Sequence, residues 1–174
     1  PEVEDLKKDV SAMQMMVDSF LNYARDLADD PVEDVDLVAL CAQLAERITP
    51  PARFELAGAP RLCALRPVPI KRAIENLLVN ACRYGSEIIL TLHFEETGLR
   101  ICVHDDGPGI PEAQRDAAAK PFVRLEAARG QNQGGGVGLG LAIAADVARL
   151  HGGQLVLSDS VKLGGLSAEI RLPL

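Results

Sequence analysis

The sequence contains few aromatic residues and no long apolar run. Aromatic residues make up 3% of its 174 residues, and tryptophan is missing. Single-stranded nucleic acid is bound largely by stacking bases on aromatic side chains, so this composition disfavours such a role. Apolar runs of about 18 or more residues are missing too, so no membrane-spanning helix is predicted. The net charge of -7 disfavours contact with nucleic acid or anionic membranes, because it repels phosphates.

Paired cysteines and histidines are lacking as well. The four cysteines are widely separated, and the three histidines are scattered. Because zinc ligands usually come in local pairs such as C-x₂-C, no structural zinc site is predicted. Reduced, mostly buried thiols in a cytosolic compartment are expected instead. No signal segment opens the chain, and it begins with Pro1 rather than Met, so we expect a piece of a longer protein.

An apolar seam runs through the first thirty residues. From Val3 to Leu27, apolar residues recur at alternating steps of three and four, which is the spacing of a coiled coil or helical bundle. One helix cannot bury such a seam alone, so the pattern predicts self-association through residues 3–28. The alternative is an amphipathic helix folded back on its own domain.

The remainder of the chain predicts a layered α+β domain. Pro31 ends the first helix, and residues 31–36 form a short acidic linker, with Asp36 as the cap of the next helix. The patterns predict helices at 37–48, 67–84 and 138–150, and strands at 53–57, 61–65, 88–94, 99–104, 155–159 and 166–172. Residues 111–135 lack periodicity and predict a long mobile loop with one helical turn. The expected fold is a two-layer α/β sandwich over 37–174, with helices on one face of a sheet, preceded by one long bundle helix over 1–30.

The first chemically informative motif lies on the predicted helix 67–84. Asn76 and Asn80 stand four residues apart and therefore share one helix face, with Arg83 nearly in line. A carboxamide oxygen suits a magnesium ion that already carries phosphate oxygens, and a guanidinium suits a phosphate. Ordinary exposed polar side chains on a helix are the alternative.

The second motif is Asp105-Asp-Gly-Pro-Gly-Ile, directly after an apolar strand. It places a carboxylate at the rim of a site, and Gly107 and Gly109 let the backbone approach a flat ligand. A carboxylate only accepts hydrogen bonds, so it fits the exocyclic amine of adenine. An ordinary β-turn is the alternative.

The third motif is a run of glycines that opens a helix, Gly134-Gly-Gly-Val-Gly-Leu-Gly-Leu. Glycines before a helix leave several amide donors free to face an anion, and the helix dipole helps. The phosphate-loop and dinucleotide fingerprints are both missing, so this is an anion-facing loop of another kind. A flexible linker is the alternative.

Together and in this order, the motifs resemble the ATP-binding boxes of the sensor histidine kinases, close to the osmosensor-like branch. That family belongs to a wider group with gyrase-type and Hsp90-type ATPases. Residues 76–85 resemble the asparagine box, 105–110 the first glycine box, 120–124 the phenylalanine box of the lid, and 136–141 the second glycine box. The resemblance covers nearly the whole chain, and it implies the histidine-kinase/Hsp90-type ATP-binding fold.

The resemblance also implies a role for each matching residue. It implies that Asn80 holds magnesium, with Asn76 beside the metal and the phosphates, and that Arg83 and Arg124 contact phosphates. It implies that Asp105 reads the adenine amine. It implies that Tyr84 and Ile110 line the pocket of the base, that Gly107 and Gly109 contact the nucleotide, and that Phe122 anchors the lid in an apolar slot. The residues that it implies around the phosphates are Gly136, Val137, Gly138, Leu139, Gly140 and Leu141. The implied ligands are ATP and Mg²⁺.

Two departures qualify the resemblance. The related ATPases place a glutamate where this chain has Asn76, which cannot act as a base near neutral pH, so slow ATP hydrolysis at most is expected. The family phosphorylates a histidine on the first of two dimerisation helices, and no such box occurs in this sequence. Residues 3–28 match the second of these helices, so we expect the chain to bind ATP without phosphorylating itself.

The resemblance therefore implies the catalytic part of a two-component sensor histidine kinase, an enzyme that phosphorylates a histidine and then an aspartate of a response regulator. It implies a cytoplasmic domain whose parent is anchored in the bacterial inner membrane. Two alternatives are a scaffold that uses no nucleotide and a serine kinase of the anti-sigma-factor type. Titration with nucleotide and magnesium distinguishes a kinase from a scaffold that binds no nucleotide. An acid-labile phosphate on the product indicates a histidine kinase, and an acid-stable phosphate indicates a serine kinase.

Overall fold

The computed structural model describes residues 30–123 and 138–174 of the chain. Its elements, in order, are β1 (Glu33–Val35), α2 (Leu37–Arg47), β2 (Arg53–Ala57), β3 (Cys63–Leu65), α3 (Pro67–Tyr84), β4 (Ile88–Glu95), β5 (Gly98–Asp105), α4 (Glu112–Ala118), α5 (Gly140–Leu150), β6 (Gln154–Asp159) and β7 (Leu166–Pro173). The long helix predicted over 3–28 lies outside these residues.

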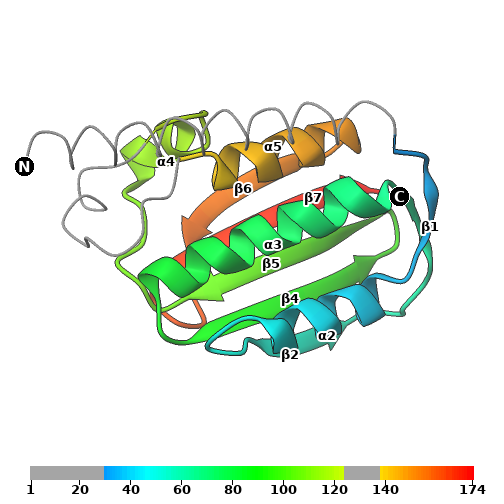
Figure 1. The fold of residues 1–174 in the computed structure, drawn as a ribbon, viewed down its shortest axis with the longest axis horizontal. Helices are drawn as coiled ribbons and strands as arrows, with labels where there is room; N and C mark the ends of the chain where they lie inside the picture. The colour runs from blue at the N-terminus through cyan, green and yellow to red at the C-terminus, as the bar shows by residue number, and fades with distance from the viewer. Residues whose placement is uncertain (1–29, 124–137) are drawn as a thin grey trace, which may run out of the picture.

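Two layers make up the domain. A five-stranded sheet has the order β2-β4-β5-β7-β6, and only the β2–β4 pair is parallel. Helices α2, α3 and α5 lie across one face of this sheet, with α3 and α5 side by side (Figure 1). The predicted α+β sandwich is confirmed.

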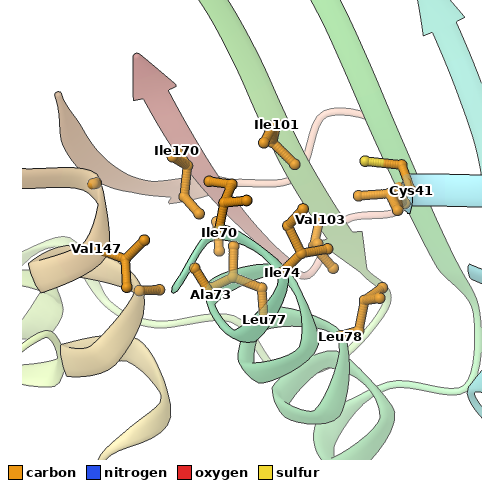
Figure 2. Packing of buried hydrophobic residues seen from close by; sticks show 14 of the residues in the cluster. Cys41, Ile70, Ala73, Ile74, Leu77, Leu78, Ile101, Val103, Val147 and Ile170 are labelled. Carbon is orange, nitrogen blue, oxygen red and sulfur yellow. The ribbon is translucent and has the colours of Figure 1, made fainter. Parts of the chain in front are cut away.

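Helix α3 shows why the chain folds into these layers. Its first turn holds Pro67 and Pro69, which suit a helix start because the first amides have no partner within the helix. Its buried apolar side chains point at the sheet and at the neighbouring helices, and Figure 2 shows them against Ile101, Val103 and Ile170. The members of this buried face are Ile70, Ala73, Ile74, Leu77, Leu78 and Ala81. One stripe of α3 therefore forms the centre of the core, and its remaining polar residues are available for chemistry.

The start of α2 also follows the prediction. The Asp36 carboxylate accepts a hydrogen bond from the Ala39 amide at 3.0 Å, which is the geometry of a helix N-cap. Apolar residues of α2, including Leu37 and Cys41, are fully buried against the sheet.

Two local predictions need correction. Residues 33–35, expected as part of a linker, form β1, which pairs with β3 in a small separate sheet. This strand is short and carries two exposed acidic residues, so no hydrophobic alternation announced it. The segment 111–135, expected as a mobile loop with one helical turn, contains α4, a helix of seven residues. Within 30–123 and 138–174, no helix is both long and apolar enough to cross a bilayer.

Candidate functional site

The three motifs meet at one edge of the sheet, where β5 ends and α5 begins. In Figure 1 this edge is on the left, at the end of α3 and beside α4. A Cβ added at Gly107 would lie 2.6 Å from the Tyr84 carbonyl oxygen, so the first glycine motif touches the end of α3. A Cβ added at Gly140 would lie 3.5 Å from Asn76 Oδ1, so the first residue of α5 touches the middle of α3. The fold therefore joins segments that are far apart in the sequence.

Asp105 is the most buried charged residue at this edge. Its exposed fraction is 3%, and its Oδ1 atom accepts hydrogen bonds from the amides of Gly107 at 2.9 Å and Leu166 at 3.0 Å. Burial raises the pKa of this carboxyl group, although the two amide bonds oppose the rise. Among the described residues both accepted bonds go to Oδ1, which leaves Oδ2 available to accept from a ligand.

The neighbouring Asp106 has a different, structural environment. It is exposed, and its carboxylate accepts from the amides of Ser86 and Glu87 at 2.6 and 2.9 Å and from the Ser86 hydroxyl at 2.8 Å. These bonds hold the pKa of Asp106 at about 2. Asp106 therefore fastens the turn between α3 and β4, and Asp105 faces the site.

The polar residues predicted on α3 lie outside its buried stripe, and Asn76 is next to the first residue of α5. Asn76 and Asn80 are half-buried, Tyr84 is half-buried, and Arg83 is exposed. The Asn76 side-chain nitrogen donates to the Arg72 carbonyl oxygen at 2.9 Å. Its Oδ1 atom is thereby turned toward Gly140. Both carboxamides thus lie on the part of α3 that the hydrophobic layer leaves open.

The described part of the glycine-rich motif supplies backbone rather than side chains. Leu139 and Leu141 are buried in the core, so only their main-chain groups can face a ligand. No side chain caps the start of α5 among the described residues, which leaves its first amides free for an anion. Gly138 has a φ of 75°, and its carbonyl oxygen accepts from the Phe122 amide at 3.0 Å, which ties Phe122 to the chain just before α5. Gly136, Val137 and Arg124 lie outside the described residues.

Phe122 does not occupy the apolar slot that was expected for it. Its side chain is 51% exposed, and its φ of 65° is unusual for a residue with a Cβ. The backbone of Phe122 is held by Gly138, and a Cβ added at Gly138 would lie 3.2 Å from the Phe122 carbonyl carbon. The main chain at Phe122 and at Gly138 therefore lies close together, with the Phe122 side chain exposed.

Ile110 ends the first glycine motif, just before α4. It is partly buried against the core, and its carbonyl oxygen accepts from Arg115 Nε at 3.0 Å. Arg115 also forms an ion pair with Asp159 at 2.6 Å, which ties α4 to the end of β6. Gly109, with a φ of 69°, makes the turn that brings Ile110 into this position.

Two residues at this edge were not found from the sequence. The Gly165 amide donates to the Asp105 carbonyl oxygen at 3.0 Å, and the Leu166 amide holds the Asp105 carboxylate. The Gly164-Gly165 pair before the last strand was a visible signal, because such a pair often marks a close backbone approach. It was not linked to the site, since the contact joins residues 61 positions apart.

Gly165→Ala is expected to disturb the site directly. Its new Cβ would lie 2.5 Å from both the carbonyl oxygen and Oδ1 of Asp105, which is closer than any real contact. Overpacking of this kind costs about 1–3 kcal/mol, so the free energy of unfolding should fall, and nucleotide affinity should fall with it. Chemical denaturation and calorimetric titration with Mg-ATP measure the two effects.

Gly164→Ala is the matched control for that variant. A Cβ at Gly164 meets nothing within 4 Å, but its φ of 86° makes any side chain strained. We expect a loss of about 1–2 kcal/mol in stability and unchanged nucleotide affinity. Equal affinity losses in the two variants would show that strain of the turn, and not crowding at Asp105, weakens binding.

A hollow of about 380 Å³ lies at the opposite end of the sheet. It is open to solvent and is lined where β5 begins and β7 ends, by residues such as Gly98, Gly153 and Pro173. It shares no residue with the three motifs. The candidate site is therefore the edge where β5 ends and α5 begins, and not this hollow.

Comparison with known proteins places this arrangement in a family. Residues 66–174 match the family described as histidine kinase-, DNA gyrase B-, and HSP90-like ATPase. The sensor histidine kinase GtrS of Pseudomonas aeruginosa is 36% identical over 172 residues, which is 98% of this chain and 35% of that protein. The chain belongs to this ATPase family, and it spans about a third of the length of the curated relatives it matches.

Solved structures agree with this assignment. The crystal structure of the ATP-binding domain of PrrB from Mycobacterium tuberculosis is 30% identical and has a TM-score of 0.64, covering 83% of this chain and 98% of that one. The NMR structure of the histidine kinase domain of the Escherichia coli osmosensor EnvZ is 37% identical and has a TM-score of 0.62, covering 84% and 91%. The fold is that of a histidine kinase ATP-binding domain.

Proposed function

We propose that this chain binds ATP with magnesium and serves as the catalytic part of a two-component sensor histidine kinase. The observation that carries the proposal is the placement of Asp105. A buried carboxylate with one oxygen fixed by two amides ends β5, the Gly107 that follows it meets the end of α3, and the uncapped N-terminus of α5 meets Asn76 on the same helix. An acceptor for an amine and a group of donors for phosphates thus lie at one edge, as a nucleotide requires.

The residues divide between the two ends of the nucleotide. At the base end, Asp105 Oδ2 accepts from the adenine amine, with Tyr84 and Ile110 against the ring and Gly107 and Gly109 allowing its close approach. At the phosphate end, the amides of α5 and the side chains of Arg83 and Asn76 hold the charge. Arg124, Phe122 and residues 136–141 are proposed to complete the enclosure.

Asn80 is proposed as the residue that holds magnesium. Among the described residues, no cluster of three histidine, cysteine or acidic side chains could hold a metal alone. One carboxamide oxygen fits magnesium, which binds through a few protein ligands plus substrate phosphates and water. The ion neutralises phosphate charge when it is bound. Asn80 would hold the ion on the face of α3 that it shares with Asn76.

In the longer protein, the γ-phosphoryl group is proposed to pass to a histidine nitrogen, leaving ADP, and then to an aspartate of a response regulator. Such a transfer needs positioning and charge neutralisation more than a base from this domain. Asn76 offers no basic group, and its amide nitrogen is already bonded to the Arg72 carbonyl. Water is therefore activated poorly. Self-association through residues 3–28 is part of the same proposal.

Two measurements test the proposed function. Calorimetric titration of the chain with ATP should show binding that depends on MgCl₂ and disappears with EDTA. A phosphoacceptor helix supplied as a separate protein, together with labelled ATP, should then yield an acid-labile phosphate on histidine. No binding in the first assay contradicts the nucleotide site, and an acid-stable product in the second indicates a serine kinase instead.

A further inference from the structure

The connection between β6 and β7, residues 160–165, is held on two sides. At its far end, the Gly165 amide donates to the Asp105 carbonyl oxygen at 3.0 Å, and the next amide, of Leu166, donates to the Asp105 carboxylate at 3.0 Å. Ser160 directly follows β6, and it is only 3% exposed although connecting segments usually lie at the surface. A buried polar residue in a connecting segment needs partners, since an unpaired buried hydroxyl is costly.

Ser160 makes the hydrogen bonds that close this connection on itself. Its amide donates to the Gly165 carbonyl at 2.8 Å, and its carbonyl accepts from the Gly164 amide at 2.8 Å. Its hydroxyl oxygen accepts from the Leu163 amide at 3.1 Å. The position of Gly165 therefore depends directly on the position of Ser160.

His104 anchors Ser160 from the outer face of the sheet. The Ser160 hydroxyl lies 3.2 Å from His104 Nδ1, and His104 is 7% exposed. Because the hydroxyl oxygen already accepts from Leu163, its proton is free to be donated to Nδ1 of a neutral imidazole. Burial lowers the pKa of His104, which agrees with the neutral form.

Adjacent strand residues point to opposite faces, which explains how this pair reaches the site. Asp105 follows His104 in β5, so the imidazole and the carboxylate lie on opposite faces of the same strand end. The connection passes from the outer face, where Ser160 is anchored, to the inner face, where Leu166 holds Asp105. One short segment thus links the two side chains around the end of the strand.

We propose that Ser160 and His104 are positioning residues for base recognition, fixing the connection so that the amides of Gly165 and Leu166 orient the Asp105 carboxylate. This role rests on the proposed function, in which Asp105 Oδ2 accepts from the adenine amine. Neither Ser160 nor His104 touches the nucleotide. Their effect is on the angle and mobility of Asp105, and hence on the preference for adenine.

Ser160→Ala tests the proposal. The affinity for Mg-ATP should fall roughly 2- to 10-fold, the equivalent of one neutral hydrogen bond, and the preference for ATP over GTP should narrow. The ratio of affinities with and without magnesium should stay unchanged, because the metal end of the site is untouched. Ser160→Thr keeps the hydroxyl and should restore both values, and Val161→Ala, at a neighbouring side chain that is 97% exposed, is the control.

A second variant tests whether the two residues act as a pair. His104→Phe keeps the ring but removes the acceptor nitrogen, so it should reproduce the loss, and the double variant should lose no more than either single one. Amide hydrogen exchange on nucleotide-free protein should show faster exchange at Gly165 and Leu166 in both variants. Additive losses, or unchanged exchange and base preference, overturn the proposal. If the wild-type chain binds no nucleotide, both the proposed function and this role are overturned. Amide hydrogen exchange at Gly165 and Leu166 would still show whether Ser160 and His104 hold residues 160–165 in place.

Discussion

Asn80→Ala is expected to abolish most magnesium-dependent ATP binding and leave the fold intact. Asn80 is half-buried on α3, next to residues that pack inward, and is proposed to supply the chain's carboxamide ligand. Loss of an outer-shell partner already lowers metal affinity by roughly 10- to 100-fold, so loss of a direct ligand should exceed about 100-fold. Titration with ATP at fixed excess MgCl₂ and again with EDTA measures the magnesium-dependent part.

Stability should not account for that loss. Alanine is a better helix former than asparagine by up to about 0.7 kcal/mol, and no apolar contact of the core is removed. The thermal midpoint should therefore stay level or rise slightly. Val79→Ala is the matched control, because Val79 is the preceding residue on α3 and is 55% exposed. Full magnesium-dependent affinity in the Asn80 variant would remove this residue from the metal site.

The helices and strands around the site follow from local patterns. The bounds predicted for α3 are the observed ones, because a proline pair marks its start and an apolar stripe of period 3.6 runs to Tyr84. The β4–β5 hairpin follows from two alternating runs around Gly98. Such features depend on residues that are close in sequence, so the sequence alone indicates them.

The features that were missed depend on tertiary contacts. β1 forms only because Cys63 and Leu65 of β3 offer it a partner strand. Spacing alone does not separate two consecutive aspartates: the family resemblance pointed to Asp105, but not to the contacts by which Leu166 holds the buried Asp105 and Ser86 holds the exposed Asp106. The exposure of Phe122 accompanies a close approach of its main chain to Gly138, which lies 16 positions along the chain. None of these outcomes is encoded in the spacing of neighbouring residues.

Burial of Asp105 has a cost that its role at the site explains. A carboxylate that is 3% exposed loses most of its hydration, and two amide hydrogen bonds restore only part of it, so its pKa is raised. An asparagine would accept the same two bonds through Oδ1 without carrying a charge. The charged residue is therefore not the most stable choice for the fold, which is typical of a functional position.

Asp105→Asn is accordingly expected to weaken nucleotide binding without destabilising the protein. The amide group would present a donor where the adenine amine also donates, so a hydrogen bond to a charged acceptor is lost. Such a bond contributes about 1.5–3 kcal/mol, which predicts an affinity for Mg-ATP roughly 10- to 150-fold lower and a reduced preference over GTP. At pH 7 the free energy of unfolding should equal or exceed that of the wild type.

The pH dependence of that stability difference has a defined sign. Because the folded-state pKa of Asp105 lies above its ordinary value of 3.8, ionisation is less favourable in the folded than in the unfolded chain. The wild type therefore loses stability relative to Asp105→Asn as the pH rises from about 4 through the raised pKa, and the difference is constant above it. Denaturant titrations of both proteins between pH 4 and 8 measure this curve. A variant that is less stable than the wild type at pH 7, or that keeps its preference for adenine, would show that the Asp105 charge supports the fold rather than the ligand.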